Sequence, residues 1–142
     1  MPSLVGSEMC IRDRNYFQTQ VASPDRSTDE ITEGCCVAAK AARLRGDAVS
    51  FFKYTSKVIA GDGCSEICCE LGHFYEETGD FEEAAVWYYN AAYETQPVLA
   101  LRSSEEEPLQ GLIRCYEQLG LPAQARSYAE ELKHRQNEQT DN

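Results

Sequence analysis

Residues 65–94 read SEICCELGHFYEETGDFEEAAVWYYNAAYE, which is the pattern of two helices joined by a Gly-Asp turn. The apolar and small residues recur at helical spacing, so each predicted helix presents one apolar face. Gly72 and Ala84 stand inside these faces, where a larger side chain would hold the two backbones apart. Because glycine in a helix interior costs about 0.5–1 kcal/mol relative to alanine, Gly72 predicts a close approach between the two helices.

Parts of this stretch recur elsewhere in the chain. The same amino acids occur at five pairs of positions that are 33 residues apart: Glu33, Cys35, Cys36, Gly46 and Asp47 correspond to Glu66, Cys68, Cys69, Gly79 and Asp80. The same amino acids occur at four pairs of positions that are 41 residues apart: Leu71, Tyr75, Gly79 and Ala84 correspond to Leu112, Tyr116, Gly120 and Ala125. Three similar hairpins are therefore predicted, which is about the number that a stacked helical array needs to bury a continuous core.

The central stretch resembles the tetratricopeptide repeat, a helix-turn-helix unit of about 34 residues. The positions that match the family pattern, and that we expect in the core, are Cys68, Leu71, Gly72, Tyr75, Ala84, Tyr88 and Ala91. Cys68 replaces a large apolar residue of the pattern, and Pro97 comes one residue late. The resemblance implies an all-α fold in which antiparallel helical hairpins stack as a TPR-like α-solenoid of about three repeats. The alternative is an ordinary helical hairpin within another kind of bundle.

The expected organisation is a TPR-like domain over residues 28–135, and its repeats are expected at 28–60, 65–97 and 108–135. The helices within it are predicted at 28–45, 47–59, 65–79, 81–94, 108–119 and 122–135. Residues 98–107 are predicted to be an insertion between the second and third hairpins.

The two ends are expected to differ from this domain. Residues 1–14 lack any periodicity and resemble a translated sequencing adaptor, so we expect a non-native or disordered leader. Residues 15–27 are interpreted as the end of a preceding helix followed by a turn, and residues 136–142 as a disordered tail.

Charge is distributed unevenly along the chain. Residues 1–60 hold eight Lys or Arg and seven Asp or Glu, whereas residues 61–142 hold five and seventeen. An acidic half of this kind argues against binding nucleic acid or anionic lipid, since both need basic surfaces. The sequence contains no run of about 18 apolar residues that could span a membrane. We expect a cytoplasmic protein.

The sequence contains seven cysteines, an odd number that is atypical of a secreted disulfide framework. Most of them fall on predicted helices, which favours small buried side chains in a reducing compartment. The alternative is a thiolate metal site formed by Cys64, Cys68 and Cys69, with His73. Since no second Cys-x-x-Cys unit completes a tetrahedral set, we expect no metal and no cofactor.

The residues show no catalytic constellation. Neither His73 nor His134 has a nucleophile or an orienting acid at a defined spacing, and the sequence has neither a glycine-rich phosphate loop nor a Gly-x-Ser-x-Gly motif. We therefore expect no catalytic residues in this chain.

The geometry of the tetratricopeptide family implies a partner-binding concave face. Its residues in the second repeat are Glu66, Cys69, His73, Glu76 and Glu77. This face is acidic, which predicts a protein partner that carries Lys or Arg. Tyr89 and Tyr93 share another face of the hairpin, and they either cover the following segment or dock a second domain or chain.

A second resemblance covers the whole stretch 28–135, carried by the phrases RLRGD, FFKY, SEICCELGHFYEETGDFEEAAVWYYNAAYET and CYEQLG. It is similar to the C-terminal helical-repeat tail of bacterial glycosyltransferases of family 2. This resemblance implies a non-catalytic interaction module, the fragment of an enzyme whose catalytic domain lies upstream and can be its partner. The alternative is a freestanding cytoplasmic TPR scaffold that binds a basic protein.

Overall fold

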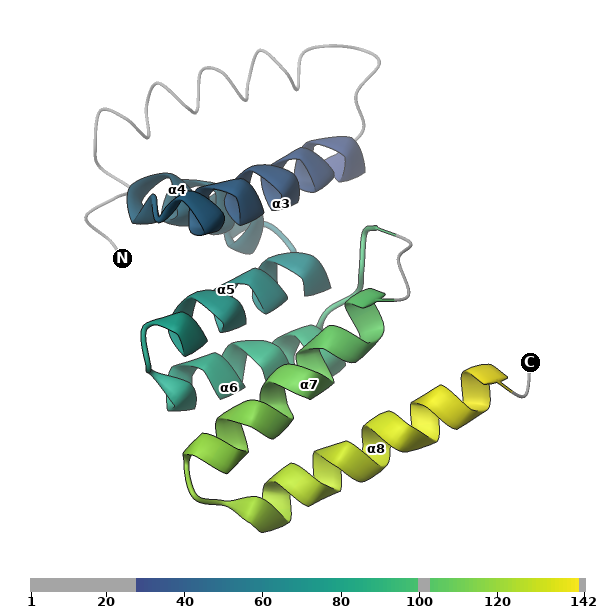
Figure 1. Ribbon diagram of the computed structural model, residues 1–142. Coiled ribbons are helices and arrows are strands. Elements are labelled where there is room, and N and C mark those ends of the chain that lie inside the picture. Colours follow the sequence, from purple (N-terminus) through teal and green to yellow (C-terminus); the bar gives the residue numbers. More distant parts are fainter. Residues whose placement is uncertain (1–27, 100–102, 141–142) are drawn as a thin grey trace. The chain divides into compact units, whose positions relative to one another are not determined.

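The computed structural model describes residues 28–99 and 103–140, and all regular structure in these residues is helical (Figure 1). The protein is therefore all-α. The predictions for residues 1–14 and 15–27 lie outside the described residues. The chain divides into two compact units, residues 1–61 and residues 62–142, and each is considered by itself.

The described part of the first unit is one helical hairpin, made of α3 (Thr28–Arg45) and α4 (Ala48–Ala60). The prediction of a helix over 28–45 is confirmed at both ends, and the predicted start of the second helix at 47 was one residue early. Asp47 is the N-cap of α4, where its carboxylate accepts a hydrogen bond of 3.1 Å from the backbone N–H of Ser50.

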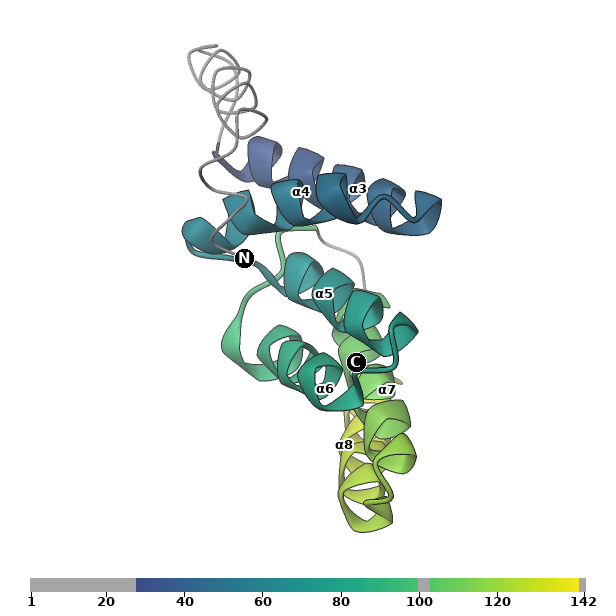
Figure 2. The same ribbon diagram turned by 90° about the vertical axis from the view of Figure 1, so that its left-hand side faces the viewer.

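The second unit contains two hairpins, which Figures 1 and 2 show as antiparallel helix pairs. Its elements are α5 (Ser65–Glu77), α6 (Phe81–Tyr89), the π-helical turn η1 (Asn90–Glu94), α7 (Ser103–Gln118) and α8 (Pro122–Thr140). α7 packs against α5, α6 and α8, so it joins the two hairpins. The buried core between them consists of Cys68, Cys69, Ala84, Ala85, Tyr88, Ala91, Leu109, Leu112 and Cys115.

The same turn closes all three hairpins. In each, a glycine with positive φ follows the first helix: Gly46 (75°), Gly79 (86°) and Gly120 (74°). The next residue donates its backbone N–H to the carbonyl five residues back, as Asp80 does to Tyr75 at 2.9 Å and Leu121 to Tyr116 at 2.9 Å. These are Schellman motifs, which require a residue that adopts the left-handed conformation easily. The glycines that recur in the sequence therefore terminate equivalent helices.

Larger differences from the predicted helix boundaries occur in the second unit. α7 begins at Ser103 instead of Pro108, so half of the predicted insertion 98–107 is helical; acidic residues in a first helical turn are favourable because they complement the helix dipole. The predicted α-helix over 81–94 changes into the wider π-turn after Tyr89.

α8 continues to Thr140, so the predicted disordered tail was wrong for residues 136–140, whereas residues 141 and 142 lie outside the described part. The extension consists mainly of good helix formers. A contact one turn apart supports it, because Glu138 lies 3.1 Å from Nε2 of His134.

Candidate functional site: the Tyr88 network and the tyrosine groove

Tyr88 lies at the centre of the second unit with none of its surface exposed. Its ring fits between two glycines, Gly72 of α5 and Gly111 of α7. A Cβ added at Gly72 would lie 2.6 Å from ring carbon Cδ1, and one added at Gly111 would lie 2.5 Å from Cζ. The close approach predicted at Gly72 is therefore occupied by an aromatic ring. Close packing against Gly111 was not predicted, although a glycine inside a predicted helix indicates that another side chain or helix packs against it.

The buried hydroxyl of Tyr88 connects two side chains of α5. It donates a hydrogen bond of 2.6 Å to Oε1 of Glu76 and lies 2.8 Å from Nδ1 of His73. Because the single hydroxyl proton is directed at Glu76, the oxygen accepts the proton of Nδ1. His73 therefore carries a proton on Nδ1, and the state of its Nε2 is determined by other neighbours.

α7 supplies the remaining members of this network, which we call the Tyr88 network: His73, Glu76, Tyr88, Glu107 and Arg114. Arg114 donates from Nε to Oε2 of Glu76 at 2.8 Å and from Nη2 to Oε1 at 3.0 Å, a bidentate pair. The Nε2 atom of His73 lies 2.6 Å from Oε1 of Glu107. Hydrogen bonds thus join α5, α6 and α7 through side chains of both hairpins.

The ionisation of these groups follows from their surroundings. Burial raises the pKa of Tyr88 above its usual value, and its hydrogen bond to Glu76 raises it further. Burial also acts to raise the pKa of Glu76, but the hydrogen bonds from Arg114 and Tyr88 outweigh it, so that this pKa lies below its usual value. The network therefore holds a neutral phenol against an ionised carboxylate.

Two core cysteines are held in the thiol form. Burial raises the pKa of Cys68 to about 11 and that of Cys115 to about 12, so both are neutral near pH 7. None of the six cysteines in the described residues forms a disulfide. The predicted role of cysteines as small buried side chains fits these positions.

The residues predicted to bind a partner also interact with other residues of the chain itself. Glu66 accepts backbone hydrogen bonds from Val98 at 3.1 Å and Leu99 at 2.6 Å, and Glu77 lies on the exposed surface of α5. His73 and Glu76 belong to the Tyr88 network, and Cys69 is buried with its Sγ 3.7 Å from Nε2 of His73. Partner binding through this face stays a prediction.

Six of the seven predicted core positions are buried. Buried residues are Cys68, Leu71, Gly72, Ala84, Tyr88 and Ala91. Tyr75 is partly buried and packs against the core of the second unit. The contacts that sequence reasoning missed are those of α7, whose Glu107, Gly111 and Arg114 complete the site.

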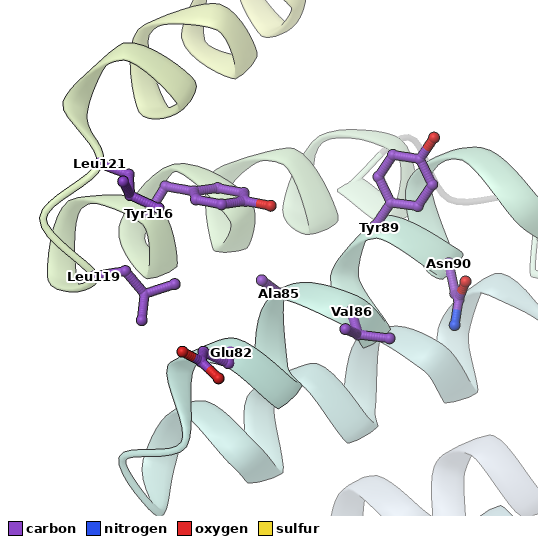
Figure 3. A pocket seen from close by; sticks show the side chains of 8 residues that line it. All are labelled: Glu82, Ala85, Val86, Tyr89, Asn90, Tyr116, Leu119 and Leu121. Carbon is purple, nitrogen blue, oxygen red and sulfur yellow. The ribbon is translucent and has the colours of Figure 1, made fainter.

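An open groove lies between α6 and the end of α7 (Figure 3). It has a volume of about 440 Å³ and is lined by Glu82, Ala85, Val86, Tyr89, Asn90, Tyr116, Leu119 and Leu121. We call it the tyrosine groove, because Figure 3 shows Tyr116 reaching from α7 towards the side on which Tyr89 stands on α6. Three of its apolar residues are exposed: Val86 (53%), Tyr89 (42%) and Leu121 (40%).

Neighbouring tyrosines hold the groove wall in place. Tyr116 stacks on Tyr128 of α8 with ring centroids 5.6 Å apart, and Tyr89 lies 4.9 Å from Tyr93. Tyr93 is in turn 6.4 Å from Tyr128, and Arg135 lies 5.3 Å above its ring. The predicted pair Tyr89 and Tyr93 therefore has two roles, because Tyr93 packs towards α8 whereas Tyr89 lines the groove.

Comparisons with known proteins identify no relative: no family model, curated protein or solved structure matches the chain. The resemblances to tetratricopeptide repeats and to glycosyltransferase tails stay predictions. Within the described residues, no helix has both the length and the apolar character that crossing a membrane requires.

The Tyr88 network predicts a pH-dependent role for Arg114. Replacing Arg114 by methionine is expected to lower the free energy of unfolding by about 1–3 kcal/mol at neutral pH, because Glu76 loses its charged donor. Since the pKa of Glu76 is depressed in the folded state, this stabilisation is complete above the usual carboxyl pKa and is lost as the pH falls through the depressed value. Urea unfolding at pH 7 and at about pH 3.5 should show the difference between Arg114→Met and wild type shrinking in acid.

The exposed Arg126 of α8 provides the matched control for this experiment. Arg126→Met is expected to change stability little at either pH. A difference between Arg114→Met and wild type that is as large in acid as at neutral pH would contradict the assigned role of the ion pair.

Proposed function

We propose that the chain is a helical-repeat protein-interaction module of the tetratricopeptide kind, which binds a segment of a partner protein in the tyrosine groove. The bound segment carries an aromatic or aliphatic anchor next to Lys or Arg. The observation that carries this proposal is the groove itself, an open apolar hollow with exposed tyrosine and valine side chains on an acidic unit.

The repeat assignment is supported by the three equivalent turns at Gly46, Gly79 and Gly120. They recur at the spacings of 33 and 41 residues seen in the sequence, and each closes a helical hairpin. Units of this kind bury their apolar faces against their neighbours and leave a surface for ligands. The recurrence of one turn geometry supports a common repeat unit.

The chemistry of the partner follows from the groove and its surroundings. Tyr89 and Tyr116 offer large apolar faces with hydroxyl groups, a combination that is enriched where proteins bind proteins. Val86 and Leu121 extend the apolar surface, and an amphipathic helix or extended segment can bury an anchor there. Glu82 lies at the rim, and residues 61–142 hold seventeen acidic and five basic residues. A basic flank next to the anchor is therefore favoured electrostatically.

A peptide-display selection against the whole chain tests this proposal. We expect the enriched peptides to combine Lys or Arg with an aromatic or aliphatic residue. Val86→Lys should weaken their binding at least tenfold, because it places a positive charge in the groove and removes an apolar contact.

The matched control is Val49→Lys in α4, since Val49 is exposed to 50% and Val86 to 53%. Val49→Lys is expected to leave the affinity unchanged. Enrichment of acidic peptides, or equal binding to both variants, would refute the groove as the binding site.

The narrower hypothesis, from the second resemblance, is that the chain is the tail of a bacterial glycosyltransferase of family 2. The partner would then be the catalytic domain of the same polypeptide, and the chain itself would contribute no catalytic residue. A long sequencing read across the start of the reading frame tests it: an in-frame catalytic domain supports the hypothesis, and a promoter directly upstream excludes it. A cytoplasmic location is proposed because none of the six described cysteines forms a disulfide.

A further inference from the structure

Three side chains with different metal-binding atoms meet where α5 contacts the start of α7. Cys69 and His73 are one helical turn apart on α5, so they share a face, and Glu107 comes from the first turns of α7. The Sγ of Cys69, a ring nitrogen of His73 and a carboxylate oxygen of Glu107 all lie within 4.8 Å of one another. Cys69 is buried, and the side chains of His73 and Glu107 are 16% and 45% exposed.

We propose that Cys69, His73 and Glu107 form a zinc site with three protein ligands and a fourth position open to water. It differs from the site weighed in the sequence, since Cys64 and Cys68 do not belong to it. The ion would link the second hairpin to the third, because two ligands come from α5 and one from α7.

Two of the three donor distances can be compared with those around a tetrahedral ion. Zinc bond lengths of about 2.0–2.3 Å place neighbouring donors about 3.3–3.8 Å apart. Cys69 Sγ and His73 Nε2 are 3.7 Å apart, whereas His73 Nε2 and Glu107 Oε1 are at a hydrogen-bonding distance of 2.6 Å. The carboxylate of Glu107 therefore has to move away from Nε2 by about 0.7 Å, which a partly exposed, flexible side chain can do.

The tautomer of His73 also suits a ligand. Its Nδ1 proton is donated to the hydroxyl of Tyr88, which in turn donates to Glu76. A ligating histidine commonly donates its other N–H in this way, and the partner orients the ring. With the proton of Nδ1 directed at Tyr88, the lone pair of Nε2 faces the carboxylate of Glu107, 2.6 Å away, and can coordinate a metal ion.

The local charges balance once the ion is bound. A doubly charged cation is neutralised by the thiolate of Cys69 and the carboxylate of Glu107. The neighbouring Glu76 is already paired with Arg114. The mixed sulfur, nitrogen and oxygen donor set suits zinc better than magnesium or calcium, which prefer oxygen ligands alone.

Titration of the tag-free, reduced chain with Co²⁺ tests the site, because cobalt takes the place of zinc and absorbs visible light when tetrahedral. We expect one Co²⁺ per chain, a thiolate-to-cobalt charge-transfer band and displacement of cobalt by Zn²⁺. Cys69→Ser should abolish the charge-transfer band, and Cys68→Ser, which changes the adjacent thiol outside the donor set, should retain it. Absence of the band in wild type, or an unchanged band in Cys69→Ser, would overturn the proposal.

A second pair of variants does not depend on changing a buried residue. Glu107→Gln is expected to weaken Co²⁺ binding at least tenfold, because a neutral amide replaces the carboxylate. His134→Gln, which alters the other histidine of the chain, should bind Co²⁺ as wild type does. Equal affinity of Glu107→Gln and wild type would show that the carboxylate is no ligand and would refute this three-ligand site.

Discussion

Tyr88→Ala is expected to lower the free energy of unfolding of the second unit by about 3–5 kcal/mol, the range for removing a buried aromatic ring. The ring fills the space between Gly72 and Gly111, and neither glycine has a side chain that could close the cavity. Urea unfolding followed by tryptophan fluorescence measures this loss directly, because the single tryptophan, Trp87, packs against the same core.

Tyr88→Phe separates the contribution of the ring to stability from that of the hydroxyl group. It keeps the packing but leaves Glu76 and His73 without their shared partner, and we expect a loss of about 1.5–3 kcal/mol, the range for hydrogen bonds to charged groups. Tyr89→Phe is the control, because Tyr89 is exposed on the same helix, and it should change stability by less than about 0.5 kcal/mol. Wild-type stability in Tyr88→Phe would mean that the hydroxyl network does not stabilise the fold.

Gly72→Ala is expected to destabilise the second unit by about 1–3 kcal/mol through overpacking. An alanine Cβ would lie 2.6 Å from two carbons of the buried Tyr88 ring, and the same ring is already in close contact with Gly111, where an added Cβ would lie 2.5 Å from Cζ. The usual gain from replacing glycine by alanine inside a helix, about 0.5–1 kcal/mol, reduces this loss but does not reverse it. Trp87 fluorescence during urea unfolding again provides the measurement.

Gly34→Ala is the matched control, since Gly34 also lies inside a helix and an added Cβ there meets nothing within 4 Å. It should stabilise α3 by about 0.5–1 kcal/mol, as slower amide hydrogen exchange in that helix would show. If Gly72→Ala also stabilised the protein, this result would contradict the assigned packing of Tyr88 against Gly72 and Gly111.

The helices were predictable where local signals mark both ends. The end of the helix over residues 28–45 was delimited correctly because Gly46 adopts a positive φ and ends the helix within a single turn of the backbone. The start of α7 was not, because Pro108 is favourable at a first helical position and the prediction therefore began the helix there, whereas α7 begins at Ser103.

The Tyr88 network was predictable only for the residues that lie within one helix. The family resemblance placed His73 and Glu76 on one face of the helix, and the glycine inside an apolar helical face identified Gly72 as a position of close contact. Their partners Glu107 and Arg114 lie 34 and 38 residues away along the chain, so their positions depend on how α7 packs, which local patterns do not reveal. For the same reason the metal site weighed in the sequence grouped cysteines that are neighbours in the chain, whereas the cluster in the structure takes only Cys69 from them.

Chemical-shift mapping of the isotope-labelled chain with a display-selected basic peptide tests the proposed interaction module most directly. We expect peptide binding to shift the amide signals around Val86, Tyr89, Tyr116 and Leu121, and Val86→Lys to remove these shifts. Shifts centred on Glu66 and Glu77 of α5, or on the first unit, would contradict the assignment of the tyrosine groove as the binding surface.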